Sequence, residues 1–147
     1  MAKGAEQRSP RHVAMDLLSR REHTRLQLSD KLRLRGYPQE EVDEALQRLA
    51  EEGLQSDRRF AEAWLRQRRE RGYGPARIRR EMAERGVSGE LIDMVMDCDF
   101  DWDASMREQR RRKFGDDLPP DYRERMKQAR FLQNRGFSSD AVMRLFR

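Results

Sequence analysis

The sequence has one cysteine, few aromatic residues and no long hydrophobic run. Cys98 is the only cysteine among 147 residues, which excludes an intramolecular disulfide and a zinc site built from several thiolates. No stretch is long and apolar enough to span a membrane, and residues 1–10 lack the apolar segment of a secretory signal. We therefore expect a soluble, cytoplasmic protein that does not bind a membrane.

Side chains that carry catalysis are also scarce. The two histidines, His12 and His23, have no neighbouring histidine or cysteine that could complete a metal site, and we expect each to be exposed or to cap a helix. The chain has no phosphate-binding loop of the Walker type and no recognisable nucleophile setting. The sequence therefore predicts neither an enzyme nor a protein that binds a cofactor, a metal or a small-molecule substrate.

The composition is charged and basic. Charged residues make up 40% of the chain and hydrophobic residues 36%, which is lean for one compact core and suits an elongated molecule. The formal net charge is +5 and the sequence pI is about 9.9. This balance favours nucleic acid or an acidic protein surface as partner.

A short motif occurs three times at a spacing of about fifty residues. It reads Arg35-Gly36-Tyr37, Arg85-Gly86-Val87 and Arg135-Gly136-Phe137. Apolar residues recur four positions before each glycine and six, nine and ten positions after it. These offsets are helical on both sides and stop at the glycine, as expected for a left-handed residue that ends a helix. A fixed period of this length indicates an array of repeated supersecondary units.

Helix start signals divide each repeat into three helices. Ser9-Pro10 and the Thr24/Gln27 capping box begin two helices, and Pro38, Asp57, Pro75, Ser88 and Ser138 mark further starts. No segment has the alternation of a half-buried strand. The sequence predicts an all-α fold of nine helices in three tandem three-helix repeats. We place a flexible tail at residues 1–9 and the repeats at 10–55, 56–100 and 101–147.

The charges are segregated along the chain. The predicted second helices and the ends of the first helices are basic, whereas the third helices are acidic. The candidate binding residues are Arg66, Arg68, Arg69, Arg71, Tyr73, Arg77, Arg79, Arg80, Arg110, Arg111, Arg112 and Lys113.

This charge pattern has two interpretations. In the first, acidic faces of one unit neutralise basic faces of the next. In the second, the arginines around the turn at Gly72–Pro75 form an exposed ridge with Tyr73 at its crest. Such an aromatic residue stacks on an unpaired base while guanidinium groups hold phosphates. The same ridge also suits a carboxylate-rich protein surface.

The central residues resemble the signature of the RecX family of recombination regulators. The resemblance rests on Arg59-Phe60-Ala61-Glu62-Ala63-Trp64, on Arg71-Gly72-Tyr73-Gly74-Pro75-Ala76-Arg77-Ile78 and on Gly86-Val87. In the first repeat, the run from Leu17 to Thr24 and Arg35-Gly36-Tyr37 are similar to that family, as is Glu51-Glu52-Gly53-Leu54 at the join between repeats. Gln55 and Ser56 replace acids usual in the family. The resemblance covers residues 11–147.

The resemblance implies an extended, curved array of three-helix units that binds the RecA recombinase. It implies that the protein lodges in the groove of the RecA filament on single-stranded DNA and contacts that DNA. There it would inhibit ATP hydrolysis, strand exchange and co-protease activity, with roles in homologous recombination, DNA repair and the SOS response. We expect a monomer. Two alternatives stay open: a stand-alone helix-turn-helix DNA-binding protein, and a helical scaffold for another acidic protein.

Overall fold

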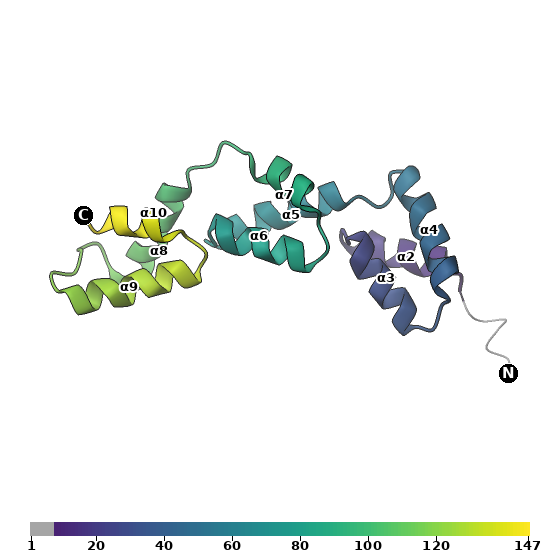
Figure 1. The fold of residues 1–147 in the computed structure, drawn as a ribbon, viewed down its shortest axis with the longest axis horizontal. Coiled ribbons are helices and arrows are strands. Elements are labelled where there is room, and N and C mark those ends of the chain that lie inside the picture. The colour runs from purple at the N-terminus through teal and green to yellow at the C-terminus, as the bar shows by residue number, and fades with distance from the viewer. Residues whose placement is uncertain (1–7) are drawn as a thin grey trace.

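The computed structural model describes residues 8–147, which contain nine α-helices and no strand (Figure 1). The all-α prediction is confirmed. Residues 1–7 of the predicted flexible tail lie outside the described part. The helices are α2 (Pro10–Arg20), α3 (Arg25–Leu34), α4 (Gln39–Glu51), α5 (Asp57–Glu70), α6 (Pro75–Glu84), α7 (Gly89–Met96), α8 (Trp102–Phe114), α9 (Tyr122–Asn134) and α10 (Ser139–Leu145).

The helices form three tandem units, and each unit has its own hydrophobic core. Unit one contains α2–α4, unit two α5–α7 and unit three α8–α10. The recurring apolar positions of the sequence lie at the centre of these cores, because they share one face of each helix. The positions four before and six after each glycine, Leu32, Met82, Leu132, Val42, Ile92 and Val142, are 0–5% exposed.

Most predicted helix starts are confirmed by the cap geometry. The Thr24 hydroxyl accepts the Gln27 N–H while the Gln27 side chain accepts the Thr24 N–H, which completes the capping box. At α5 the predicted start near Asp57 is confirmed, but the expectation that Asp57 is the N-cap is wrong by one position. Ser56 is the cap, because its hydroxyl accepts the Arg59 N–H, and Asp57 is the first helical residue.

The repeated glycines end the second helix of each unit. Gly36, Gly86 and Gly136 have φ angles of +93°, +94° and +107°, a region that side chains with a Cβ avoid. The next residue in each unit donates its N–H back to the helix, as Val87 does to the carbonyl of Met82 over 3.0 Å. This is the helix ending that the motif predicted.

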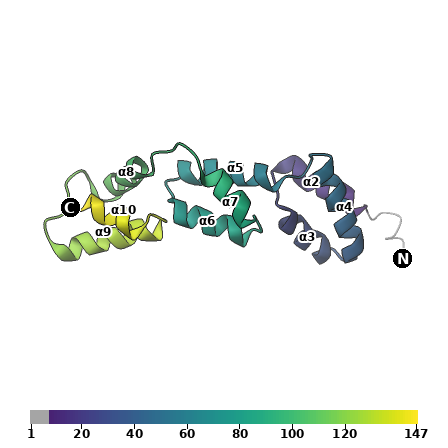
Figure 2. The ribbon, with the colours of Figure 1, turned by 45° about the horizontal axis from the view of Figure 1, so that its top comes forward.

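The three second helices lie end to end, in the order α9, α6, α3, along one side of an elongated, curved array (Figures 1 and 2). The end of α9 meets the beginning of α6, and the end of α6 meets the beginning of α3. The array therefore presents a continuous row of helices from one end to the other.

Units one and two meet through the glycine turn of unit two. The hydroxyl of Thr24, at the start of α3, donates to the carbonyl of Arg85 over 2.6 Å. A Cβ on Gly86 would lie 2.6 Å from the Cβ of Leu26, so the turn approaches α3 as closely as only glycine permits.

Units two and three meet in the equivalent way, fifty residues later. The N–H of Gly74 donates to the carbonyl of Arg135 over 2.7 Å, and the N–H of Ala76 to that of Gly136 over 3.0 Å. A Cβ on Gly136 would lie 2.5 Å from the Cβ of Arg77. Both junctions thus join the end of one second helix to the beginning of another.

His23 departs from the sequence prediction because it is buried, with 2% of its surface exposed. It lies between α2 and α3, where Nδ1 is 3.0 Å from the Arg21 carbonyl and Nε2 is 3.4 Å from Lys31 Nζ. A lysine only donates, so we assign Nε2 as the acceptor and the proton to Nδ1. Burial lowers the pKa of this imidazole. His12 is exposed, as predicted.

No helix within residues 8–147 has the length and apolar character needed to cross a lipid bilayer. No group of three or more histidine, cysteine or carboxylate side chains in the same range is arranged to hold a metal ion.

Candidate partner-binding surface

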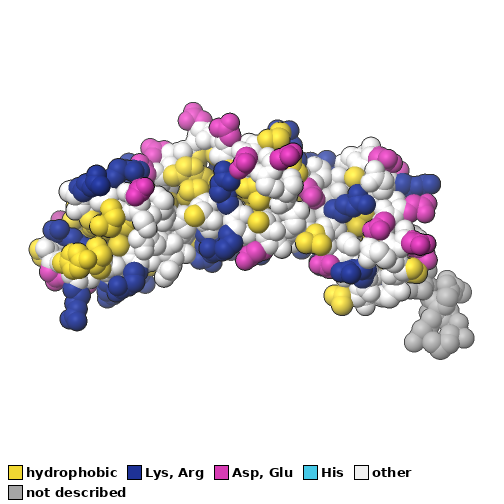
Figure 3. Space-filling view, in the orientation of Figure 1, with side chains coloured by type: hydrophobic (Ala, Val, Ile, Leu, Met, Phe, Trp, Pro, Cys, Tyr) yellow, Lys and Arg dark blue, Asp and Glu magenta, His cyan; other side chains and the backbone are white. Residues whose placement is uncertain are grey.

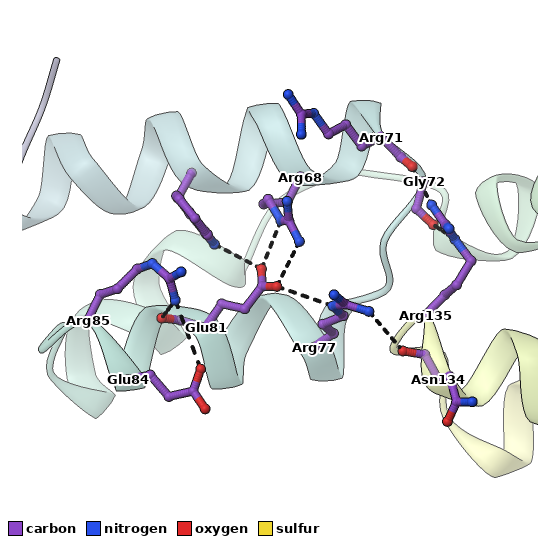
Figure 4. A network of polar contacts seen from close by, with 10 residues as sticks. Arg68, Arg71, Gly72, Arg77, Glu81, Glu84, Arg85, Asn134 and Arg135 are labelled. Carbon is purple, nitrogen blue, oxygen red and sulfur yellow. Dashed lines mark hydrogen bonds and ion pairs between the residues drawn. The ribbon is translucent and has the colours of Figure 1, made fainter. Parts of the chain in front are cut away.

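The turn between α5 and α6, which the sequence singled out, packs against unit three. Figure 4 shows side chains from both units meeting there. Arg68 and Glu81 come from the facing sides of α5 and α6, and Arg135 reaches in from the end of α9. The turn is therefore part of a junction as well as part of the surface.

Glu81 is the acid at the centre of this junction, with 11% of its side chain exposed. Its two oxygens accept from Nε and Nη2 of Arg68 over 2.9 Å and 2.8 Å. Arg77 Nε and the indole N–H of Trp64 donate to the same carboxylate over 3.2 Å and 3.1 Å. Burial alone would raise the pKa of Glu81, but these bonds outweigh it and lower the pKa.

Tyr73 is half-buried between arginines. The guanidinium carbons of Arg68, Arg77 and Arg135 lie 4.1 Å, 4.3 Å and 4.4 Å from its ring centre. The prediction that Tyr73 forms an exposed crest is therefore wrong. Three guanidinium groups lie close to its ring, which has only two faces. A role of Tyr73 in contacting a partner stays a prediction, but stacking on a base requires the arginines to move.

Arg135 is an important residue of this junction that sequence reasoning missed. Its Nε donates to the carbonyl of Gly72 over 3.2 Å, and its Nη2 donates to the carbonyl of Arg71. Burial lowers its pKa, although a guanidinium stays charged. The signal was present in the sequence, because an arginine precedes the motif glycine in every repeat.

Arg110 is buried, with 5% of its surface exposed. Its guanidinium donates to the carbonyls of Gly115 and Asp116 over 2.9 Å and to Gln128 over 3.3 Å. It closes the loop that follows α8 and is not available to a partner. The run Arg110–Lys113 looks uniformly basic in the sequence, so the burial of Arg110 was missed. Residues about four positions apart share one face of a helix, and one member of such a run can therefore face the core.

The other candidate residues differ in their burial and in whether an acid pairs with them. Arg79 pairs with Asp93 over 2.8 Å, and Arg111 and Arg112 share Glu108 over 2.8 Å and 3.4 Å. Arg69 is half-buried and lies 4.9 Å from the ring centre of Phe100. Within residues 8–147, the exposed candidates without an ion pair are Arg66, Arg71, Arg80 and Lys113.

Arg66 also lines a cleft between units one and two, with a volume of about 620 Å³. Arg21 and Arg85 line the same cleft, and Arg85 lies 4.2 Å from the ring centre of Trp64. Glu22 and Glu70 line it too, so the cleft carries charges of both signs.

The row of second helices carries further exposed positive charge. Arg123, Lys127 and Arg130 on α9 are exposed and continue the positive surface beyond Arg79 and Arg80 of α6. Figure 3 shows Lys and Arg side chains over α8 and along the edge beneath α6 and α9, with acids around the segment between α7 and α8. Sequence reasoning passed over the α9 residues because they are spaced along the helix.

Three family models match the chain in the order of its units. They describe the first, second and third three-helix domains of RecX and match residues 11–49, 56–96 and 101–146. Together they account for most of the chain.

Similar proteins agree with these models. A regulatory protein RecX of Pseudomonas fluorescens strain Pf-5 is 48% identical over 136 residues, which cover 92% of this chain and 88% of that protein. Its counterpart in Ectopseudomonas mendocina is 49% identical over 138 residues, 93% of this chain and 92% of that protein. A crystal structure of RecX from Lactobacillus salivarius has a TM-score of 0.77 at 22% identity, with 93% and 92% of the two chains covered.

Proposed function

Since this chain belongs to the RecX family of regulatory proteins, we propose that it binds the RecA recombinase filament on single-stranded DNA. There it lowers ATP hydrolysis, strand exchange and co-protease activity. The observation that carries the proposal is the curved row of second helices, whose exposed basic residues on α6 and α9 follow one side of the array. A long, curved, basic surface fits a helical groove that combines phosphates with acidic side chains.

The junctions suggest how such binding would inhibit. Backbone hydrogen bonds from Gly74 and Ala76 to unit three, and the bond from the Thr24 hydroxyl to the Arg85 carbonyl, tie the units into one body. A body that spans neighbouring recombinase subunits opposes the rearrangement between subunits that each nucleotide cycle requires. Inhibition therefore needs no catalytic group on this chain.

A stand-alone helix-turn-helix protein is the alternative, because three-helix units also occur in that class. In that class a helix of each unit enters the major groove with residues that contact phosphates and bases. Here α4 has five acids and one base between Gln39 and Glu51, and α7 has two acids and no base. The charge of these helices opposes their insertion into DNA.

The deciding experiment is the ATPase rate of RecA on single-stranded DNA as this protein is added. We expect the rate to fall as the protein approaches stoichiometric amounts. An unchanged rate would reject the proposed function. Tight, salt-sensitive binding to duplex DNA without any effect on RecA would favour the helix-turn-helix alternative.

A further inference from the structure

The arginine–glycine turn occurs three times, but only two copies have a neighbour in the described chain. Gly86 and Gly136 lie against the beginnings of α3 and α6, whereas Gly36 is exposed. A Cβ on Gly36 would have nothing within 4 Å. The turn of unit one therefore has the backbone shape of a docking turn, with φ +93°, but no neighbour within residues 8–147.

The groups that make the two existing junctions are free in unit one. The carbonyls of Arg35 and Gly36 accept no hydrogen bond from residues 8–147, whereas those of Arg135 and Gly136 both do. The Arg35 side chain is exposed. Beside it, Leu34 is 87% exposed, more than any other large hydrophobic residue in the described chain. This exposed side chain stands beside two backbone carbonyls that have no hydrogen-bond partner in residues 8–147.

A second copy of this chain does not offer the matching surface. The beginnings of α3 and α6 are already covered by units two and three. Unit three begins its second helix differently, because α9 starts at Tyr122, about one turn earlier than the repeat period predicts. Glu124 stands where unit two has Gly74, and its N–H is bound by Asp121 Oδ1 over 2.7 Å. The array is therefore closed to head-to-tail addition at unit three.

We propose that the turn Leu34–Gly36 docks the first turn of an α-helix of the partner protein, which is the recombinase if the proposed function holds. The partner's free helical N–H groups donate to the carbonyls of Arg35 and Gly36, as Gly74 and Ala76 donate within this chain. The Arg35 guanidinium holds the carbonyls that precede the partner helix, as Arg135 holds those of Arg71 and Gly72. The negative end of α3 thereby meets the positive end of the partner helix.

The test uses Gly36→Asn, with Gly53→Asn as the matched control. Both glycines have positive φ angles, +93° and +75°, and both have open space where a Cβ would stand. Asparagine tolerates this conformation better than most residues, so both variants should fold. Only at residue 36 does the new side chain occupy the place that a docked helix would take.

Binding is measured by co-sedimentation with RecA filaments on single-stranded DNA, and separately on the bare DNA by fluorescence anisotropy. We expect Gly36→Asn to weaken filament binding by roughly tenfold or more, and Gly53→Asn to leave it unchanged. Bare-DNA affinity and the circular dichroism spectrum should match between the two. Because Leu34 is so exposed, Leu34→Asp gives an independent variant that leaves the core intact and should also weaken filament binding.

Equal filament affinity of Gly36→Asn and Gly53→Asn would overturn the inference while leaving the proposed function standing. If either asparagine variant melts early, Leu34→Asp decides: unchanged filament binding by that variant overturns the docking turn. A parent protein that fails to bind the filament would overturn the proposed function, and this inference with it.

Discussion

Glu81 and Arg68 form a two-pronged ion pair between α6 and α5, with 11% and 13% of their side chains exposed. The Arg68 guanidinium also lies 4.1 Å from the ring centre of Tyr73. A residue expected on a free positive ridge thus holds unit two together.

Removing the charge of Glu81 should destabilise the fold. In Glu81→Gln the half-buried Arg68 and Arg77 lose their counter-charge, and breaking such a pair costs about 3 kcal/mol. Urea unfolding measures this loss. The control is Glu84→Gln, because Glu84 is 62% exposed and its nearest Arg85 nitrogen is 3.9 Å away; that variant should stay within about 0.5 kcal/mol of the parent. Equal stabilities of the two variants would contradict the structural role of Glu81.

His23 should make the protein less stable as the pH falls below neutrality. Because burial lowers its pKa in the folded state, the unfolded chain binds the proton first, and stability declines from about pH 6.5 downward. Unfolding midpoints at pH 7.5 and 5.5 measure this. His23→Gln should lose less stability over that interval, whereas His12→Gln, at an exposed position, should behave as the parent. A His23→Gln slope equal to that of the parent would count against the neutral, buried ring.

The repeated glycines Gly36 and Gly86 should differ in how much they tolerate alanine. Gly36→Ala and Gly86→Ala meet the same left-handed strain, about 1 kcal/mol, since φ is +93° and +94°. Only at Gly86 does the new methyl group approach Leu26 Cβ to 2.6 Å, which adds roughly 1–3 kcal/mol for overpacking. Chemical denaturation of both variants measures the difference. Equal losses would mean that units one and two do not pack this closely.

Reversing the exposed, unpaired arginines should weaken binding without unfolding the chain. We expect the triple change of Arg66, Arg71 and Arg80 to glutamate to keep the helical content and to raise the protein concentration needed for half-inhibition of RecA by roughly tenfold. If these residues meet phosphates, the slope of log affinity against log salt falls by about 0.7 per lost contact on single strands. Arg68 is unsuited to this test, because its reversal would place a second acid against Glu81.

The control for this charge reversal is the same change at Arg20, Arg48 and Arg58, which lie outside the turn Leu34–Gly36. All three are exposed, at 70%, 67% and 59%, and each pairs with an acid of its own helix. This control should inhibit RecA nearly as well as the parent. Equal inhibition by both triple variants would show that the basic surface of unit two does not bind the partner.

Much of the fold could be read from local pattern. The capping box at Thr24 and the stop at Gly86 depend on residues within one or two turns, so the sequence alone predicts them. The helical spacing of Leu32 and Val42 predicted the buried face of each unit in the same way. The error at Ser56 arose because serine and aspartate are both good caps and stand side by side.

The candidate site could be read less well, because it depends on contacts between distant residues. The run of arginines from Arg66 to Arg80 looks uniform, yet α5 and α6 turn Arg68 and Arg77 toward Glu81 and leave Arg66 and Arg80 in solvent. The burial of Arg110 has no signature in neighbouring residues. The repeated arginine–glycine motif marks Arg135, but it does not show that this side chain reaches into unit two.

The amino-acid sequence by itself determined where helices begin and end and that the same unit recurs three times, because hydrophobic period, caps and glycine stops act over a few residues. Tertiary structure alone decided which guanidinium groups face a buried carboxylate, and that the turn at Gly36 has no neighbour in residues 8–147 while its two counterparts do. The physical reason is that charge pairing and docking depend on which helix ends meet in space.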